Sequence, residues 1–327
     1  MRELTFGEAI REALYEEMER DKDVIVMGED IGEYGGLQGV TTGLLERFGI
    51  DRVLETPISE CAVIGAATGA ALKGFRPVIE IGIADILSVA MDQIVNSAAK
   101  MRYFYCGQSS VPLVIRAISG ESGGGGPQHS QCPEAWFVHV PGLKVVMPST
   151  PRDAKGLMKA SIRDNDPVIF FEQKSLFHMR GPVPEGEFII PLGQSEIKRS
   201  GIDVTLIATG SMVNKSLLAA EKLQQDNINI EVLDPLTLKP LDKKAIIESI
   251  KKTGRALIVH EAHKTGGWGG EVAALIVEEA YDYLKAPILR LGALDVPIPC
   301  SPPMINLIIP DEEKIIEGAK RLYTYKH

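Results

Sequence analysis

The chain has 327 residues, of which 45% are hydrophobic and 24% are charged, a composition typical of soluble globular proteins. It carries 35 Lys and Arg residues against 44 Asp and Glu residues, which gives a formal net charge of −9. No run of five basic residues occurs, and binding to a phosphate backbone requires clustered Lys and Arg side chains. The sequence therefore predicts no nucleic-acid partner.

Cysteine use and the apolar runs indicate the compartment. The four cysteines, Cys61, Cys106, Cys132 and Cys300, lie far apart and form no C-x-x-C pair, which is typical of a reduced chain. The longest uncharged apolar run, residues 61–72, is too short and too rich in glycine to cross a bilayer. Charged residues near the N-terminus stand where a signal peptide needs an apolar stretch. We expect a protein of the cytoplasm, or of an organelle matrix after processing, with no membrane partner.

Apolar runs and helical patterns alternate along most of the chain. Thr5 and Glu8 form a capping-box sequence ahead of a first amphipathic helix. Strands are predicted at residues 24–27, 77–83, 111–118, 143–147, 168–171, 204–208, 228–233, 257–260 and 288–291, and helices at 60–72, 87–102, 152–163, 212–225, 242–252 and 270–284. The strands are nearly continuous runs of Val, Ile and Leu, as expected for strands covered on both faces. The alternation predicts an α/β fold with largely parallel sheets.

One segment marks a domain boundary. Residues 180–187 hold two prolines and two glycines without a regular period, which is typical of an inter-domain linker. We therefore predict a first α/β domain at 1–185, a linker at 186–195 and a second α/β domain at 196–327, in agreement with the two domains that the length suggests.

Three motifs partly match active-site sequences of other enzyme classes, namely serine hydrolases, enzymes with a thiol nucleophile and zinc peptidases. Gly120–Gly124 matches the G-x-S-x-G nucleophile elbow of serine hydrolases, but the glycine run and Pro127 that follow are a poor helix start. Cys132 close to His129 would suit a thiol nucleophile, although such an isolated pair is more often incidental. The segment 260–263 places two histidines three residues apart, which differs from the H-E-x-x-H spacing of zinc peptidases. This segment follows a predicted strand and is expected to be a loop. No phosphate-binding P-loop and no dinucleotide fingerprint occur.

The most informative region is residues 55–64. Ser59 can cap the helix predicted at 60–72, and Glu60 falls in its first turn beside wholly apolar residues. One interpretation is favourable placement of a charge at the helix N-terminus, worth about 0.3–1 kcal/mol. The other is a carboxylate set in an apolar pocket to exchange a proton with a cofactor. The residues alone leave both interpretations open.

Several longer runs resemble one family. They are TPISE at 56–60, MDQIVNSAAK at 91–100, QHSQCPEAW at 128–136, HVPGLKVVMPSTPRDAKGL at 139–157, RDNDPVIFFE at 163–172, DVTLIATG at 203–210 and TGGWGGE at 265–271. Together they resemble the beta subunit of the thiamine diphosphate-dependent first component of 2-oxo acid dehydrogenase complexes, in order from about residue 3 to residue 323. Glu80-Ile81, residues 171–174 and Gly267-Trp268 look closer to the acetoin and branched-chain types than to the pyruvate type.

The resemblance implies a fold and an activity. The fold would be a pyrimidine-binding parallel-sheet domain followed by a transketolase-like C-terminal α/β domain. The activity would be that of an oxidoreductase, active only with an alpha subunit. The enzyme would cleave a 2-oxo acid or acetoin at its carbonyl and pass the acyl group to lipoyl on an acyltransferase.

Site residues follow from the same resemblance. Glu60 would hydrogen-bond a ring nitrogen of the cofactor's aminopyrimidine and so promote proton removal from the thiazolium carbon. His129 would assist proton transfer during acyl handover to lipoyl. Further residues implied in cofactor binding are Glu29, Ile58, Ile86 and Gln93, and those implied in binding a monovalent cation such as K⁺ are Leu113, Ser161, Ile162, Asp164 and Asp166.

Two departures refine the expectation. The chain has neither the Gly-Asp-Gly nor the Asn-Asn sequence with which thiamine diphosphate enzymes hold the diphosphate through Mg²⁺. It can therefore supply only half of such a site, so the alpha subunit would hold most of the Mg²⁺ shell in a heterotetramer of two alpha and two beta chains. Ile86 stands where the family has Phe or Tyr, which removes aromatic stacking worth about 0.5–1.5 kcal/mol. Gly82 and Leu87 suggest that the whole segment is reshaped.

Two other functions stay open at this point. One is a split transketolase-like carboligase subunit without a lipoyl acceptor, and the other is a non-catalytic scaffold subunit. Glu60 and His129 argue against the scaffold, whereas Ile86 favours it slightly. The substrate cannot be chosen, because much of its pocket would belong to the alpha chain.

Overall fold

The computed structural model describes residues 2–326 and divides the chain into two compact units. The first comprises residues 1–119 and 136–192, and the second comprises 120–135 and 193–327. The domain ranges 1–185 and 196–327 and the linker 186–195 stay predictions, and the outermost residues, Met1 and His327, lie outside the described part.

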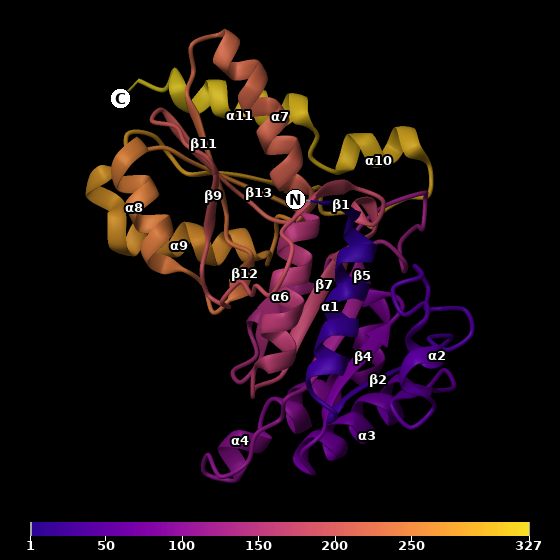
Figure 1. Ribbon diagram of the computed structural model, residues 1–327. Coiled ribbons are helices and arrows are strands. Elements are labelled where there is room, and N and C mark those ends of the chain that lie inside the picture. The colour runs from indigo at the N-terminus through magenta and orange to yellow at the C-terminus, as the bar shows by residue number, and fades with distance from the viewer. Residues whose placement is uncertain (1, 327) are drawn as a thin grey trace. The chain divides into compact units, whose positions relative to one another are not determined.

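The first unit is built around a parallel sheet (Figure 1). Its elements are β1 (Arg2–Thr5), α1 (Phe6–Arg20), β2 (Val24–Gly28), α2 (Leu44–Phe48), β3 (Val53–Glu55), α3 (Glu60–Leu72), β4 (Arg76–Ile81), η1 (Ala84–Ala90), η2 (Gln93–Ala98), α4 (Met101–Phe104), β5 (Val114–Ser119), β6 (Lys144–Val146), α6 (Pro151–Arg163), β7 (Val168–Gln173), η3 (Lys174–Leu176) and β8 (Arg180–Val183); the short helix α5 (Glu134–Val138) spans a junction between the two units' ranges. Six of these strands pair in parallel in the order β6-β7-β5-β4-β2-β3. Their almost completely buried Val, Ile and Phe side chains explain why the sequence shows apolar runs instead of alternation.

The N-terminal helix begins as its sequence predicts. The Thr5 side chain accepts a hydrogen bond from the backbone N–H of Glu8, and the Glu8 carboxylate accepts one from the backbone N–H of Thr5. Figure 1 draws α1 beside α6, and the two helices are in contact. Two fully buried lysines of α6, Lys155 and Lys159, pair with Glu16 of α1 at 2.7 and 2.6 Å. This pairing is why two lysines can lie in the interior without an uncompensated charge.

Two segments of the first unit differ from the prediction. The range 87–102, predicted as one helix, contains a 3₁₀ helix (η1), a π-helical turn (η2) and the short α4. A side chain competes there with regular helical bonding, because the hydroxyl of Ser88 donates to the backbone carbonyl of Asp85 at 2.9 Å. Residues Arg180–Val183 of the segment interpreted as a linker form β8, which pairs antiparallel with β1.

The second unit is a five-stranded sheet with helices on both faces (Figure 1). Its elements are β9 (Glu196–Arg199), β10 (Val204–Ala208), α7 (Ser211–Gln225), β11 (Ile230–Asp234), β12 (Thr237–Lys239), α8 (Lys243–Thr253), β13 (Ala256–His263), α9 (Trp268–Ala280), η4 (Tyr281–Tyr283), β14 (Leu289–Ala293), α10 (Pro302–Ile308) and α11 (Glu312–Tyr323). The strand order is β14-β13-β10-β11-β9, with only β9 antiparallel to its neighbour. Helices α7 and α11 cover one face and α8 and α9 the other. The predicted α/β fold with largely parallel sheets is confirmed in both units.

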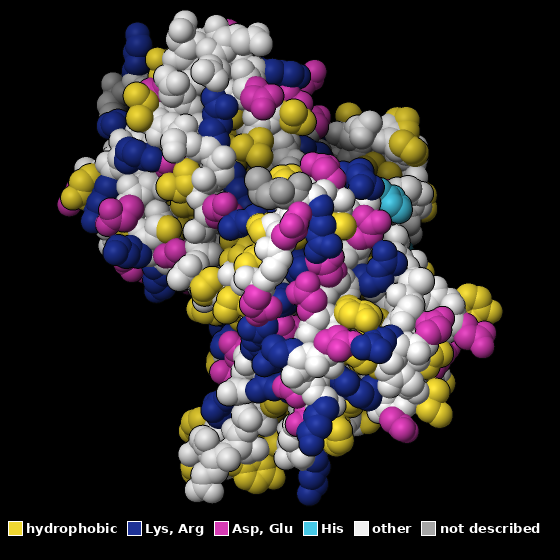
Figure 2. Space-filling model, in the orientation of Figure 1, with side chains coloured by type: hydrophobic (Ala, Val, Ile, Leu, Met, Phe, Trp, Pro, Cys, Tyr) yellow, Lys and Arg dark blue, Asp and Glu magenta, His cyan; other side chains and the backbone are white. Residues whose placement is uncertain are grey.

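Charges of both signs are interspersed on the surface. On the face that Figure 2 displays, Lys and Arg side chains lie among Asp and Glu side chains. Some surface charges are paired, such as Lys222 with Glu312 at 2.7 Å and Lys320 with Asp226 at 2.7 Å. Such exposed pairs contribute little to stability, about 0–1 kcal/mol each.

Candidate active site

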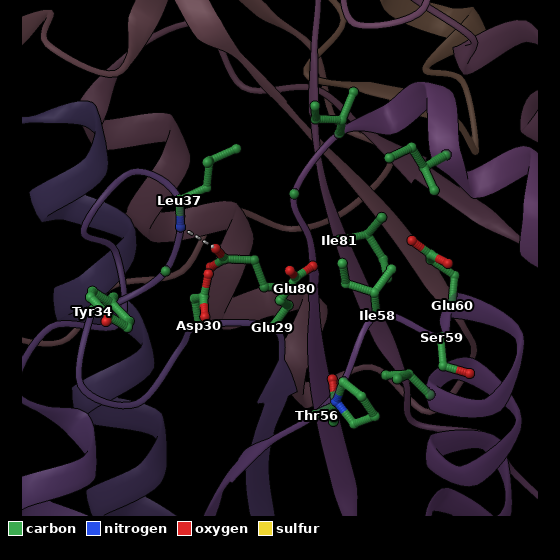
Figure 3. A pocket seen from close by; sticks show the side chains of 16 residues that line it. Glu29, Asp30, Tyr34, Leu37, Thr56, Ile58, Ser59, Glu60, Glu80 and Ile81 are labelled. Carbon is green, nitrogen blue, oxygen red and sulfur yellow. Dashed lines mark hydrogen bonds between the residues drawn. The ribbon is translucent and has the colours of Figure 1, made fainter.

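The first unit contains a cavity at the carboxyl edge of its sheet. Strands β2, β3 and β4 are neighbours and run parallel, so the residues that follow each of them meet at the same edge. In open α/β sheets this edge is where ligands bind. The cavity has a volume of about 400 Å³. It is lined by Glu29, Asp30, Tyr34, Gly36, Leu37, Thr56, Pro57, Ile58, Ser59, Glu60, Val63, Glu80, Ile81, Gly82, Ile83 and Ile86, of which ten are labelled in Figure 3.

Glu60 is the first residue of α3, and its side chain reaches this cavity. The segment before it is fixed where the backbone N–H of Thr56 donates to the carbonyl of Gly28 at 2.9 Å. Ser59 occupies the N-cap position as predicted, but its side chain makes no capping hydrogen bond. The first-turn N–H groups of α3 and the helix dipole favour a negative charge at Glu60. In Figure 3, Ile58 and Ile81 lie between Glu60 and the carboxylates of Glu29 and Glu80.

Three further carboxylates line the same cavity: Glu29, Asp30 and Glu80. Burial raises the pKa of Glu29, and the nearby charges of Asp30 and Glu60 raise it further. A raised pKa brings a carboxyl group closer to the range in which it can exchange protons near neutral pH. The cavity therefore brings together acidic groups whose negative charges repel one another.

Glu80 is held by a buried ion-pair cluster in the sheet. Arg116 of β5, 1% exposed, donates to the carboxylate of Glu80 at 2.7 Å and to both carboxylate oxygens of Glu172 in β7 at 2.6 and 3.0 Å. Burial alone would lower the pKa of Arg116, but the charges and hydrogen bonds of the two glutamates raise it above its usual range. Burial raises the pKa of Glu172, and Arg116 opposes this change. The second oxygen of Glu80 accepts the backbone N–H of Leu37 at 3.0 Å.

A glycine allows the loop after β2 to approach Glu80. Gly36 has a φ of +78°, in the left-handed region that favours glycine. A Cβ atom there would lie 2.5 Å from Oε1 of Glu80. The backbone N–H of Gly36 donates to the carbonyl of Asp30 at 2.8 Å, which closes the loop over the carboxylate. The buried cluster and the loop thus fix one wall of the cavity.

Four of the five predicted cofactor residues meet in this cavity, namely Glu29, Ile58, Glu60 and Ile86. Gln93 is not among the lining residues: its side chain packs against α3, where a Cβ on Gly65 would lie 3.2 Å from Oε1 of Gln93. Asp30, Tyr34, Leu37 and Glu80 line the cavity and were not predicted. For Glu80 a signal existed, because a charged residue interrupts each of the apolar strands β4, β5 and β7.

The lining of the cavity suits an aromatic nitrogen heterocycle but not a diphosphate. Side chains of Ile58, Ile81, Ile83 and Ile86 provide apolar surface, and carboxylates provide acceptors, which suits a flat nitrogen heterocycle. Among the lining residues, all of which lie in the described part of the chain, there is no Lys, Arg or His. Of the four carboxylates only Glu80 is paired with a cation, Arg116, so the other three would repel a diphosphate.

The residues implied in binding a monovalent cation lie at the C-terminal end of α6 and around the start of β7; they are Leu113, Ser161, Ile162, Asp164 and Asp166. The guanidinium group of Arg76 donates to the carbonyls of Ile162 and Asp164 at 2.9 and 3.0 Å. Lys144 pairs with the side chain of Asp164 at 2.5 Å, and Arg102 pairs with that of Asp166. Arg76 thus brings positive charge to two of the carbonyls, whereas Lys144 and Arg102 pair with the neighbouring carboxylates.

The histidine pair considered for zinc lies in β13 and not in a loop as expected. His260 and His263 are three residues apart on β13, and the register of its pairing with β14 shifts between Val259 and His263. Burial, together with the charge of Arg290, lowers the pKa of His260 to about 4. Within the described residues no group of three His, Cys, Asp or Glu side chains is placed to hold a metal. This pair is a structural feature of the sheet.

His129 lies in the second unit, in the loop 120–133 that follows β5. Its backbone N–H donates to the carbonyl of Gly126 at 3.3 Å. No helix begins within residues 120–133, all of which are described, so Ser122 does not sit on the strand-to-helix turn of a nucleophile elbow.

Glu134, just after this loop, is a buried acid in the second unit. It is 2% exposed, and its Oε2 atom has no hydrogen-bond partner in the described part of the chain. Burial, opposed by its own backbone N–H and reinforced by the charge of Glu261, raises the pKa of Glu134 to about 8. The folded state therefore binds a proton that the unfolded state releases near its ordinary pKa of 4.5.

This difference predicts a pH dependence of stability. Between pH 5 and 8 the free energy of unfolding should fall by up to about 1.4 kcal/mol per pH unit through Glu134, and level off above pH 8. Urea denaturation of wild type and Glu134→Gln across pH 5–9 measures the free energy of unfolding. In the variant this free energy should decrease much less with pH than in wild type. The exposed Glu221→Gln in α7 is the control. A pH profile of Glu134→Gln that matches that of wild type would contradict the prediction.

Within the described residues, no helix is both long enough and apolar enough to cross a membrane.

Comparison with known proteins identifies the class. The chain matches the family model "Transketolase, pyrimidine binding domain" at residues 2–179 and the model "Transketolase, C-terminal domain" at residues 193–315. Its fold resembles that of a split-gene transketolase solved as an inactive beta4 tetramer, with a TM-score of 0.82 over 99% of both chains. At 22% identity this similarity shows the fold alone.

Curated relatives narrow the class. The chain is 46% identical over 324 residues to the 2-oxoisovalerate dehydrogenase subunit beta of Bacillus subtilis, covering 98% of this chain and 99% of that protein. It is 43% identical over 327 residues to the acetoin:2,6-dichlorophenolindophenol oxidoreductase subunit beta of the same organism, covering 96% of each. It is also 43% identical over 321 residues to the pyruvate dehydrogenase E1 component subunit beta of Rhizobium meliloti, covering 98% and 70%. The chain belongs to the family of beta subunits of 2-oxo acid and acetoin dehydrogenases, as the resemblance predicts.

Proposed function

We propose that this chain supplies the aminopyrimidine half of a thiamine diphosphate site to a 2-oxo acid or acetoin dehydrogenase component. The observation that carries the proposal is the cavity at the carboxyl edge of β2, β3 and β4, which has an apolar wall and Glu60 at a helix N-terminus. An alpha subunit would supply the diphosphate half with Mg²⁺, in a heterotetramer of two alpha and two beta chains. The absence of cationic residues from the cavity lining, within the described part of the chain, supports this division.

Each lining group would have a distinct role. The Glu60 carboxylate would accept a hydrogen bond from a ring nitrogen of the aminopyrimidine and hold a proton there. The side chains of Ile58 and Ile86 would pack against the ring and exclude water from the Glu60 carboxylate. Glu29, whose pKa burial raises, lies near enough to Glu60 for the two charges to interact. When bound, the cofactor supplies the nucleophilic carbon and the electron sink for cleavage beside the substrate's carbonyl.

His129 would act after this cleavage. We propose that it transfers a proton while the acyl group passes to the lipoyl group of an acyltransferase. An imidazole suits this task because its ordinary pKa lies near 6.5, so it can both accept and donate a proton near neutral pH.

Reconstitution with an alpha subunit tests the proposed function. The relatives are named for three substrates at 43–46% identity, so pyruvate, a branched-chain 2-oxo acid and acetoin are all offered. We expect turnover of one of them with a lipoyl domain as acceptor, and none by the isolated chain. A complex that transfers only ketol groups between sugars would show the carboligase instead, and an alpha chain active without this one would show the scaffold.

The other parts of the proposal concern location and ions. Four free cysteines, three of them exposed, suit the reducing cytoplasm, which we propose as the compartment. A monovalent cation at the end of α6 is not included, because Arg76 supplies positive charge to two of its carbonyls.

We expect the side chain of Ile86 to set the width of the cavity in which the cofactor binds. It lies in η1 and forms the apolar wall with Ile58, Ile81 and Ile83. Ile86→Phe should overpack this wall at about 1–3 kcal/mol, which weakens cofactor binding roughly 5- to 150-fold. Calorimetric dissociation constants for thiamine diphosphate in the reconstituted complex provide the measurement, with the volume-conserving Ile86→Leu as control. Tighter binding of the Phe variant with retained activity would show instead that Ile86 only lacks a stacking ring.

A further inference from the structure

The loop that carries His129 is attached to the carboxyl edge of the second unit's sheet. Strands β10 and β13 are parallel neighbours, and Glu261 lies near the carboxyl end of β13. Ser211, the first residue of α7, follows β10. This edge is the usual position of a ligand in an α/β sheet. Here the chain's own residues 120–135 belong to the same compact unit and bond to this edge.

Glu261 is the attachment point. It is 7% exposed, and its Oε1 accepts the backbone N–H of Glu121 at 2.7 Å. Its Oε2 accepts the hydroxyl of Ser211 at 3.0 Å. Both carboxylate oxygens are thus used, one on the loop and the other on the start of α7. The loop begins at a fixed point of the second sheet.

Glu121 then bonds the two ends of the loop segment that includes His129. Its Oε1 accepts the backbone N–H of Gly124 at 2.7 Å, and its Oε2 accepts the hydroxyl of Ser130 at 2.6 Å. Hydrogen bonds to a charged acceptor are about twice as strong as neutral ones. One carboxylate therefore links residues on both sides of His129.

The segment needs such a link because its backbone is otherwise permissive. Gly123, Gly124 and Gly126 have φ values of +81°, +79° and +76°, which only glycine adopts readily. Fixing each residue costs about 1–2 kcal/mol of backbone entropy, and glycine loses the most. The segment also passes close to Cys300, whose Sγ would lie 2.6 Å from a Cβ on Gly126. The contacts of Glu121 span this segment, and the backbone N–H of Gly120 donates to the carbonyl of Gln131 at 3.1 Å across the same loop.

We propose that Glu121 is a positioning residue for His129, which fixes the glycine-rich segment 123–130 by bonding Gly124 and Ser130 while Glu261 anchors its start. This inference rests on the proposed role of His129 in acyl handover. Loss of the Glu121 carboxylate should therefore impair transfer to lipoyl and spare the earlier step, in which Glu60 acts.

Three variants in the reconstituted complex test the proposal. Glu121→Ala removes both bonds. Glu121→Gln keeps them, since its amide oxygen can accept from Gly124 and its amide nitrogen can donate to Ser130 Oγ. Ser122→Ala is the matched control, an exposed neighbour in the same loop.

Two activities and one structural readout are measured for each variant. Reduction of 2,6-dichlorophenolindophenol reports the reaction without lipoyl, and acylation of a lipoyl domain reports the handover. A misplaced catalytic group costs up to about 100-fold, so Glu121→Ala should lower the handover roughly 10- to 100-fold and leave dye reduction within about twofold. Amide hydrogen exchange should show faster exchange in 120–130 for this variant only, and Glu121→Gln should restore both properties.

The results separate this inference from the function it rests on. Unchanged exchange in 120–130 for Glu121→Ala, or equal losses in the two activities, would overturn the positioning role. His129→Ala is measured in parallel. If His129→Ala leaves acyl transfer to lipoyl intact, the proposed role of His129 is wrong. The positioning role of Glu121 in catalysis is then wrong as well, even if hydrogen exchange shows that Glu121 orders the loop. A selective handover loss in both variants supports the inference.

Discussion

Replacing Glu60 with Gln in the complex with an alpha subunit is expected to slow exchange of the thiazolium proton of bound thiamine diphosphate by about 10²–10⁴-fold. The change keeps the size of the side chain at the start of α3 and removes only the carboxylate that would hold the proton. The free energy of unfolding should change by no more than about 0.3–1 kcal/mol, the contribution of a charge at a helix N-terminus. Proton exchange followed by NMR, with urea denaturation alongside, measures both quantities.

Glu271→Gln is the matched control for this experiment. Glu271 is also an acid in the first turn of a helix, α9, but it is exposed in the second unit. It should show the same small change in stability and no change in proton exchange. Unaltered exchange in Glu60→Gln, with a stability loss like that of the control, would mean that Glu60 is only a charge at a helix terminus.

Arg116→Met is expected to cause the largest loss of stability, about 3–5 kcal/mol. The substitution leaves Glu80 and Glu172 buried without the cation that both of them contact. Removing one member of a buried ion-pair cluster costs more than the pair contributes, because an uncompensated charge stays in the interior. Urea denaturation at neutral pH measures the change in the free energy of unfolding.

Arg47→Met is the control for Arg116→Met. Arg47 pairs with Glu19 on the surface, where the two side chains are 54% and 40% exposed, so the loss should stay below about 1 kcal/mol. A second comparison replaces Arg116, Glu80 and Glu172 together by apolar residues, which should recover much of the stability. Equal losses in Arg116→Met and Arg47→Met would contradict the structural account of the cluster.

Much of the fold could be predicted because its strands are buried on both faces. The ranges 204–208 and 60–72 coincide with β10 and α3, and the other predicted strands are found within a few residues. A strand at the edge of a sheet was not predicted because it lacks an apolar run. Strand β9, with the sequence Glu-Ile-Lys-Arg, lies at the edge of its sheet. Helix α11 was missed although Asp311 caps it, with its side chain accepting from the backbone N–H of Lys314 at 2.8 Å.

The site was predictable where its residues are close in sequence. Ile58 and Glu60 lie in one motif next to a helix start, and both line the cavity. Glu80 and Leu37 are 43 residues apart, and only the pairing of β4 with β2 brings them into one wall. The link between Glu121 and Glu261 spans 140 residues, and no local pattern indicates it. Long-range contacts of this kind arise from sheet order and not from periodicity.

Calorimetric titration of thiamine diphosphate with Mg²⁺ into the isolated chain tests the central claim most directly. Under the proposal the cavity would receive the aminopyrimidine, and its carboxylates, of which only Glu80 is paired with a cation, would repel the diphosphate. We therefore expect no tight, Mg²⁺-dependent binding by the isolated chain, and tight Mg²⁺-dependent binding once an alpha subunit is added. Tight Mg²⁺-dependent binding to the isolated chain would contradict the claim that it supplies only half of the site.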